Sequence, residues 1–123
     1  MKILVIDDEE IVRYLLNRTL TTSGYQVIEA CDGIQGLSLA KENLPNLIIL
    51  DLLMPNMDGF EVLENLKSNN ATNSIPVIIF SCMEIREKQH IEISKKANLL
   101  LSKVTPPNEI IDKVKEVLNA NRI

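Results

Sequence analysis

Short apolar runs alternate with helical patterns five times along this chain. The runs are rich in Val, Ile and Leu, which is typical of strands that are buried on both faces of a sheet. We predict strands at residues 2–6, 25–30, 47–50, 75–80 and 99–101. Strands that alternate with helices form a parallel sheet covered by helices, because parallel strands need long connections. Right-handed crossovers then restrict this α/β fold to a doubly wound parallel sheet.

The helical patterns place apolar side chains three or four positions apart, so each predicted helix has one face directed at the sheet. The first helix ends near Ser23-Gly24, and the second lies between Asp32 and Pro45. The third begins at Asp58-Gly59, the fourth covers 84–96, and the last follows Pro106-Pro107. The residues expected to face inward are Ile11, Val12, Leu15, Leu16, Leu20, Ile34, Leu37, Ala40, Leu44, Phe60, Leu63, Leu66, Ile85, Ile91, Ile110, Ile111, Val114, Val117 and Leu118.

Composition excludes several classes of function. The 123 residues fit one domain, 1–123, and their net charge of −4, with no Lys/Arg-rich stripe, argues against a nucleic-acid-binding surface. No apolar run is long enough to span a bilayer, and the N-terminus lacks a signal-peptide pattern. Cys31 and Cys82 lack metal-binding spacing, so we interpret them as reduced thiols of a cytoplasmic protein.

Polar residues follow four of the five predicted strands, at the point where each strand ends. Asp7 and Asp8 follow the first strand, Asp51 the third, Ser81 the fourth, and Lys103 closely follows the fifth. Each has a common structural role when taken alone, as a helix cap, a turn residue or a surface charge. Parallel strands bring all their carboxyl ends to one edge of the sheet, however, and that edge is where ligands bind in such folds. We therefore expect these side chains to lie together.

Three neighbouring carboxylates repel one another, and either protonation or a bound cation relieves the repulsion. Ligands that are all oxygen atoms favour a hard cation such as Mg²⁺. A carboxylate beside Mg²⁺, an ammonium group and a hydroxyl donor form a set of groups suited to phosphoryl transfer. The strand ends therefore indicate phosphoryl chemistry with Mg²⁺.

Four segments carry a family resemblance: 6–9 (IDDE), 51–59 (DLLMPNMDG), 75–81 (IPVIIFS) and 99–103 (LLLSK). With them the chain resembles, over essentially its whole length, a response-regulator receiver domain, the phospho-acceptor module of two-component signalling. The resemblance implies a flavodoxin-like (βα)5 fold, a doubly wound sandwich whose five-stranded parallel sheet has the strand order 2-1-3-4-5.

The resemblance also assigns the acidic residues. It implies that Asp51 accepts a phosphoryl group from a histidine kinase or a phosphotransfer protein. It further implies that Asp7, Asp8 and Asp51 hold Mg²⁺, with the backbone carbonyl of Leu53 completing the protein's ligands. The chain is then expected to promote only its own phosphorylation and dephosphorylation, and not to be an enzyme for other substrates.

Two further residues and a surface take their roles from the resemblance. Ser81 matches the residue whose hydroxyl turns toward the phosphoryl group, and Lys103 matches the lysine that pairs with a phosphoryl oxygen. Output is expected through an unknown partner protein at the face formed by 84–96, 99–101 and the last helix. No DNA-binding segment follows the last helix in this chain, so we expect output by partner binding.

The chain departs from the family pattern at two informative positions. Val104 follows Lys103 where the family has Pro after a cis peptide bond, and we predict a trans bond because a cis bond without Pro costs about 2.5–4 kcal/mol. Leu100 stands where the family has the Tyr or Phe that moves with the hydroxyl residue. The usual hydroxyl-to-aromatic coupling therefore cannot operate in its normal form.

Other functions remain as alternatives. The two departures favour a phosphorylation-independent interaction module, whereas the intact acidic, hydroxyl and lysine set argues against it. A Mg²⁺-dependent phosphatase would place a second acid two residues after the nucleophile, where this chain has Leu53. A flavin carrier of the same fold would need a phosphate-binding loop after the first strand, where this chain has Asp7 and Asp8.

Overall fold

The computed structural model describes residues 1–82 and 87–121, and strands and helices alternate along them. The elements are β1 (Lys2–Ile6), α1 (Glu10–Thr22), β2 (Gln26–Ala30), α2 (Gly33–Asn43), β3 (Leu47–Leu50), α3 (Gly59–Ser68), β4 (Val77–Ser81), α4 (Glu87–Lys96), β5 (Leu99–Ser102) and α5 (Pro107–Ala120). The strands form one parallel sheet in the order β2-β1-β3-β4-β5. The predicted fold class and strand order are both confirmed.

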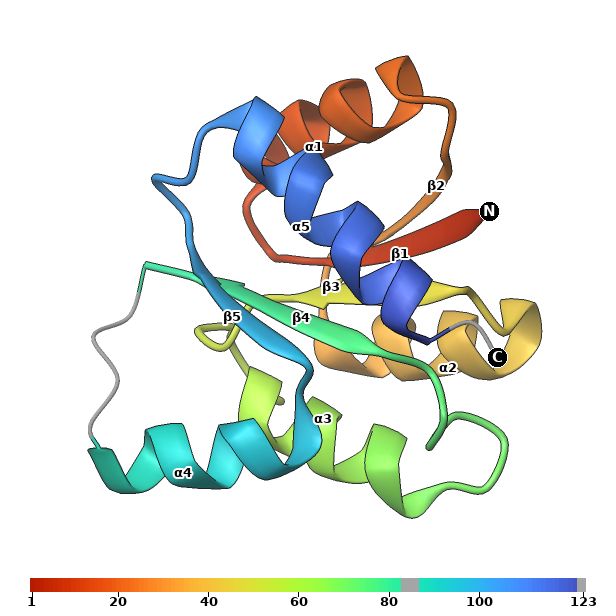
Figure 1. Ribbon diagram of the computed structural model, residues 1–123. Helices are drawn as coiled ribbons and strands as arrows, with labels where there is room; N and C mark the ends of the chain where they lie inside the picture. Colours follow the sequence, from red (N-terminus) through yellow and green to blue (C-terminus); the bar gives the residue numbers. More distant parts are fainter. Residues whose placement is uncertain (83–86, 122–123) are drawn as a thin grey trace.

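The register of the sheet brings the strand ends together. Ile6 at the end of β1 pairs with Leu50 at the end of β3, and the amide of Asp51 donates to the carbonyl oxygen of Ile6 at 3.0 Å. On the other side of β3, Ser81 at the end of β4 pairs with Ser102 at the end of β5. All of these ends lie along the left edge of the sheet in Figure 1.

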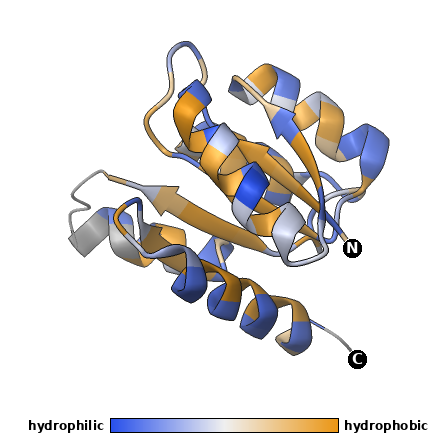
Figure 2. Cartoon of the chain, turned by 90° about the horizontal axis from the view of Figure 1, so that it is seen from above, coloured by the Kyte–Doolittle hydropathy of each residue, from blue (hydrophilic) through white to orange (hydrophobic). Residues whose placement is uncertain are grey.

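Helices cover both faces of the sheet, with α1 and α5 on one face and α2, α3 and α4 on the other (Figure 1). Successive residues of a strand point to opposite faces, so each strand contributes to two cores. Ile3, Val5 and Ile49 pack with α1 and α5, whereas Leu4 and Ile48 pack with α2, α3 and α4. The central strand β3 is accordingly made of apolar residues only, whereas the edge strand β2 also carries Gln26 and Glu29; the strands are mostly orange in Figure 2. Among the described helices, none combines the length and the apolar character needed to cross a membrane.

β4 begins two residues later than predicted. The amide of Ile75 donates to Thr72 in a turn, and the carbonyl of Pro76, which has no N–H of its own, accepts from Ile48. Regular pairing therefore starts at Val77.

The predicted inward faces of three helices were partly wrong. Ile11 and Leu15 of α1 are 61% and 55% exposed. Ile34 is 65% exposed, because the buried positions of α2 are Gly33, Gly36 and Ala40.

Leu44, at the end of α2, is also exposed, and it caps the helix in a left-handed conformation. In α4, Ile93 is buried and Ile91 is 49% exposed, while Ile85 lies outside the described residues. The inward residues predicted for α5 are buried or half-buried in the core, as expected.

Gly59 allows the acidic strand end and α3 to approach each other closely. Its amide donates to the carbonyl oxygen of Leu52 at 2.9 Å, and Asp58 caps α3 by accepting the amide of Glu61 at 3.0 Å. A Cβ atom at Gly59 would overlap the carbonyl oxygen of Asp51 and lie 2.5 Å from Cα of Leu52. These obstacles are backbone atoms, so a side chain cannot be accommodated by a change of rotamer.

We predict that Gly59→Ala destabilises the protein by about 3 kcal/mol, because the backbone after Asp51 must move. Gly36→Ala is the matched control, because the three atoms nearest to its Cβ would all belong to the side chain of Ile6 and none to the backbone. Urea unfolding of both variants measures the difference. A loss for Gly59→Ala no larger than that for Gly36→Ala would contradict the close approach described here.

Candidate functional site

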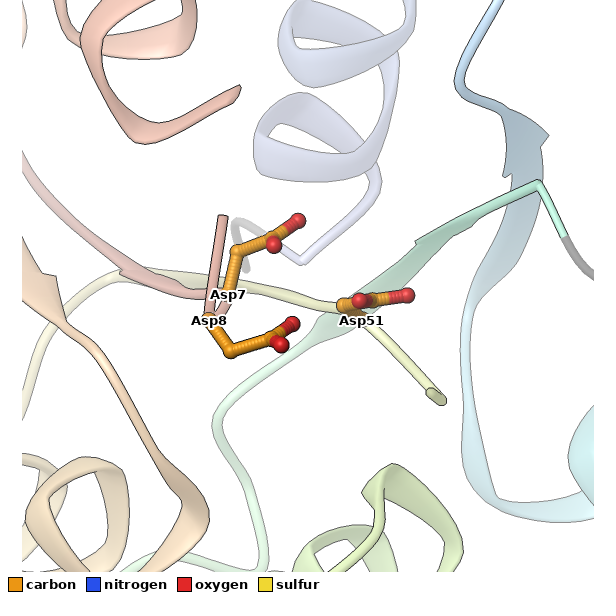
Figure 3. Close-up of side chains that lie close together, drawn as sticks. All are labelled: Asp7, Asp8 and Asp51. Atoms are coloured by element: carbon orange, nitrogen blue, oxygen red, sulfur yellow. The ribbon is translucent and has the colours of Figure 1, made fainter. Parts of the chain in front are cut away.

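Three carboxylates meet at the carboxyl edge of the sheet. Asp7 and Asp8 follow β1 and Asp51 follows β3, and their side chains extend side by side (Figure 3). Each offers a carboxylate oxygen, and the three oxygens all lie within 4.8 Å of one another. Asp7 and Asp51 are each only 2% exposed, whereas Asp8 is exposed. The predicted convergence of the acidic strand ends is therefore found in the structure.

Lys103 brings a positive charge into this cluster from the end of β5. Its Nζ lies 3.0 Å from Oδ2 of Asp7, 3.2 Å from Oδ2 of Asp51 and 2.9 Å from Oε1 of Glu9. The lysine side chain is only 10% exposed, so water screens these ion pairs less than it would at an open surface. One ammonium group thus contacts two buried carboxylates and one exposed carboxylate, and it offsets part of their negative charge.

The site changes the proton affinity of two of these groups. Burial raises the pKa of Asp7 above its ordinary value, although the amide of Glu9 and Lys103 oppose the shift, and the charge of Asp51 adds to it. Burial by itself would lower the pKa of Lys103, but the hydrogen bonds to Glu9 and Asp7 and the charges of Asp7 and Asp51 raise it further than burial lowers it. Lys103 is therefore firmly protonated at neutral pH.

Asp7 and Asp51 are oriented in the same way. In each, Oδ1 accepts the backbone amide two residues further on, from Glu9 at 2.9 Å and from Leu53 at 3.3 Å. The other oxygen, Oδ2, faces Lys103 in both. Local backbone bonds thus fix one oxygen of each carboxylate and leave the other for a cation.

Ser81 lies buried at the end of β4, with 4% of its surface exposed, and its carbonyl oxygen accepts the amide of Lys103 at 3.2 Å. The structure thus places Ser81 at the same sheet edge as the acids. A contact between its hydroxyl and a phosphoryl group stays a prediction. The role of the Leu53 carbonyl as a ligand also stays a prediction.

The Lys103–Val104 peptide bond is trans, as predicted. Ser102 organises the loop, because its Oγ accepts the amide of Val104 at 3.3 Å and its carbonyl oxygen accepts the amide of Thr105 at 3.0 Å. Lys103 therefore reaches the acidic cluster without the Lys-Pro step of the family pattern. Leu100, at the position of the family's aromatic ring, is half-buried and packs against the core on the α4 face.

Sequence reasoning missed two residues of the site. Glu9 is the N-cap residue of α1, but its side chain makes no capping bond and pairs with Lys103 instead. Arg13 is a charged residue in the first turn of α1, and its Nη1 donates to the carbonyl oxygen of Asp7 at 2.8 Å. The available signal was spacing, because Arg13 lies one helical turn beyond Glu9 and its side chain is long enough to reach back.

The donor set fits a hard divalent cation. The three groups that could bind a metal are all carboxylates, and Asp7, Asp8 and Asp51 are close enough for one ion or its bound waters to contact all three. Among the described residues, this is the group of His, Cys, Asp and Glu side chains that could hold a metal. Cys31 and Cys82 are free, exposed thiols and take no part in it.

Comparison with known proteins identifies the family. The model of the response regulator receiver domain matches residues 3–115, so the chain belongs to that family. This family defines the chain as a receiver module of two-component signalling, in agreement with the fold and the acidic edge described above.

Two curated transcriptional regulators are similar in sequence to this chain. Over 122 residues the chain is 34% identical to the alkaline phosphatase synthesis transcriptional regulatory protein PhoP of Bacillus subtilis, covering 99% of this chain and 50% of PhoP. It is 35% identical over 117 residues to the probable transcriptional regulator ycf27 of Porphyridium aerugineum, covering 95% of this chain and 48% of that protein. The chain thus spans about half the length of these curated relatives.

Among solved structures, the chemotaxis protein CheY4 of Vibrio cholerae superimposes with a TM-score of 0.86 at 28% identity. The match covers 94% of this chain and 97% of that chain. The fold of this chain is therefore that of a CheY-like receiver domain along nearly its whole length.

We predict that Lys103→Met tightens Mg²⁺ binding about tenfold, which corresponds to about 1.4 kcal/mol. In the wild type, the Lys103 ammonium group contacts the same carboxylate oxygens that Mg²⁺ would bind, and its positive charge repels Mg²⁺. Titration calorimetry with MgCl₂ measures the change. Lys113→Met is the matched control, because it removes an equal charge from an exposed pair with Glu116 on α5. Equal effects of the two substitutions would show that only net charge matters.

The raised pKa of Asp7 predicts a pH dependence of the same binding. A protonated carboxyl group does not bind Mg²⁺, so affinity is retained above the folded-state pKa of Asp7 and declines as the pH falls through it. Because this pKa lies above the ordinary 3.8, the decline begins at a higher pH than an unperturbed aspartate would give. Calorimetry across a pH series tests this. An affinity that stays constant down to pH 3.8 would contradict it.

Proposed function

We propose that this chain is the phospho-acceptor of a two-component phosphorelay and receives its phosphoryl group on Asp51 from a phosphohistidine. The donor is a histidine kinase or a phosphotransfer protein. One observation carries the proposal: Asp51 is a buried carboxylate with one oxygen 3.2 Å from the Lys103 ammonium group, beside Asp7 and Asp8. Membership of the receiver family supports it.

The residues of the site have distinct roles in this transfer. An oxygen of Asp51 attacks phosphorus while the bond from phosphorus to the donor nitrogen breaks, giving an acyl phosphate. Lys103 exchanges its contact with Asp51 for one with a phosphoryl oxygen, and Ser81 donates its hydroxyl to another. Asp7 and Asp8, with Asp51, hold Mg²⁺, which when bound neutralises charge on the carboxylates and the phosphoryl group.

The rim of the site suits a protein donor. Leu53 is 53% exposed two residues after Asp51, and Val104 is 87% exposed beside Lys103. Leu15, which is 55% exposed, lines a hollow of about 200 Å³ together with Lys103. Exposed apolar side chains around a charged site are typical of a surface that another protein covers.

Output is proposed through a partner protein at the face of α4, β5 and α5. Between α4 and β5 lies a hollow of about 280 Å³, whose lining includes Ile93, Ala97 and Leu100. Phosphorylation changes partner affinity only as far as the two states differ in their contacts at this face. The Ser81 and Lys103 contacts with the phosphoryl group supply the free-energy difference between the states. The chain is proposed to catalyse only its own phosphorylation and dephosphorylation.

We predict that incubation with acetyl phosphate and MgCl₂ adds one phosphoryl group to the wild-type chain, measured as intact mass. Asp51→Asn, which removes the nucleophilic oxygen, is expected to abolish the adduct. Asp112→Asn is the matched control, since it removes a carboxylate from α5, and it is expected to leave the adduct intact.

Two results would contradict the proposal: no adduct on the wild type, or an undiminished adduct on Asp51→Asn. Sustained turnover of a simple phosphate ester would favour the phosphatase alternative. Omitting MgCl₂ is expected to slow adduct formation at least tenfold, because the carboxylates then repel the incoming phosphoryl group.

The alternative is a phosphorylation-independent interaction module, and the packing of Leu100 into the core on the α4 face favours it. An amide NMR spectrum before and after phosphorylation separates the two. The main proposal predicts shifts both around Asp51 and along β5 and α5. Shifts confined to the acidic edge would show that phosphorylation is not transmitted, and would support the alternative.

A further inference from the structure

Arg13 links residues 7–9, the acidic loop between β1 and α1, to the neighbouring strand β2. It lies one turn into α1, and its Nη1 donates to the carbonyl oxygen of Asp7 at 2.8 Å. Its Nε lies 3.4 Å from Oε1 of Glu29 on β2, and the arginine side chain is only 16% exposed. The other carboxylate oxygen of Glu29 accepts Nδ2 of Asn17 at 2.9 Å. The guanidinium group is therefore held between a strand end and the backbone of Asp7.

The acidic loop needs such support, because α1 gives it little. The N-cap residue of α1, Glu9, makes no side-chain capping bond, since its carboxylate contacts Lys103 instead. Asp7 is instead fixed through both backbone groups, its amide donating to Ala30 of β2 at 3.1 Å and its carbonyl accepting Arg13. Without Arg13, the carbonyl oxygen of Asp7 loses the hydrogen bond that ties it, through Glu29, to β2.

We propose that Arg13 is a positioning residue for the divalent-cation site. It holds the peptide between Asp7 and Asp8 so that both carboxylates face Asp51, although it touches neither the cation nor the phosphoryl group. This inference rests on the proposed function, which places Mg²⁺ at the three aspartates. Groups that orient metal ligands in this way typically change metal affinity by about tenfold or more when they are removed.

The sign of the effect separates positioning from charge. A guanidinium group near the site repels Mg²⁺, so removing its charge would tighten binding if charge alone mattered. Positioning predicts the opposite, because a loose Asp7-Asp8 loop must be ordered by the cation at a cost in free energy. Arginine also suits the role better than lysine, since its planar group donates in two fixed directions at once.

The test is titration calorimetry with MgCl₂ on four chains: wild type, Arg13→Gln, Arg13→Lys and Arg18→Gln. Arg18 lies one turn beyond Arg13 and contacts Tyr14 at the surface, so its substitution removes the same charge without touching the loop. Arg13→Gln is expected to raise the dissociation constant about tenfold. Arg13→Lys is expected to raise it about threefold, and Arg18→Gln to leave it unchanged or slightly lower.

A second measurement separates affinity from chemistry. The rate of phosphorylation by acetyl phosphate is measured as a function of MgCl₂ concentration. For Arg13→Gln the half-saturating concentration is expected to rise in parallel with the dissociation constant, while the rate at saturating MgCl₂ stays near the wild-type rate. A general disturbance of the fold would lower the saturated rate as well.

The outcomes are distinct. Unchanged or tighter binding in Arg13→Gln overturns the inference, and so does an equal loss in Arg18→Gln. If Arg13→Gln does not fold, Glu29→Gln replaces it; this variant keeps Arg13 but weakens its anchor, and an unchanged dissociation constant there overturns the inference. Absence of Mg²⁺ binding by the wild type also overturns it. Mg²⁺ binding without phosphorylation of the wild type overturns the proposed function and leaves the role of Arg13 standing.

Discussion

Repulsion among three carboxylates at one edge of a sheet is the constraint on which the rest of the site depends. Two of them, Asp7 and Asp51, are almost completely buried, where water cannot screen their charges. The chain offsets this charge with Lys103, whose ammonium group contacts both buried acids and Glu9. Negative charge and oxygen ligands of this kind favour a cation and disfavour an anion that no cation accompanies. The same arrangement therefore accounts for the place of Lys103 beside Asp51, and it makes the carboxylate oxygens suitable ligands for a hard cation.

The fold maintains this costly arrangement through backbone bonds. Parallel pairing of β1 with β3 sets Asp7 and Asp51 side by side, and the amide of Asp51 is bound to Ile6. Gly59 then brings the start of α3 against the backbone of Asp51 and Leu52, which restricts movement of this strand end away from Asp7. Because main-chain groups fix the positions, the acids stay close in spite of their charge. Burial of apolar side chains in the two cores stabilises the fold, and this free energy offsets the destabilising repulsion among the carboxylates.

Much of the fold and of the acidic edge could be predicted from the sequence, for a physical reason. Buried strands have continuous apolar runs, and parallel strands bring their carboxyl ends together, so the positions of Asp7, Asp8, Asp51 and Lys103 follow from the strand boundaries alone. Helix faces were harder to predict. Gly36 lets α2 approach Ile6 of the sheet, and a pattern that counts large apolar residues cannot detect a contact made by the absence of a side chain. Arg13 and Glu9 were missed because a charged residue near a helix start has the same local pattern whether it faces solvent or a buried carbonyl.

The chain has Leu100 in place of the family's aromatic ring, and the backbone near Lys103 connects the acidic edge to α5 instead. The amide of Lys103 is bound to the carbonyl of Ser81, and Ser102 ties the following loop to Thr105, two residues before α5 begins. The side chain of Lys103 also lines the hollow between α1 and α5, together with Phe80 and Ile110. A displacement of Lys103 toward a group on Asp51 therefore acts on the start of α5 and on its packing against α1. Leu100, packed on the opposite face, is not needed for this connection. Under the proposed function, phosphorylation of Asp51 would therefore reach the surface through Lys103 and its loop, where a trans Lys103–Val104 bond replaces the family's Lys-Pro step.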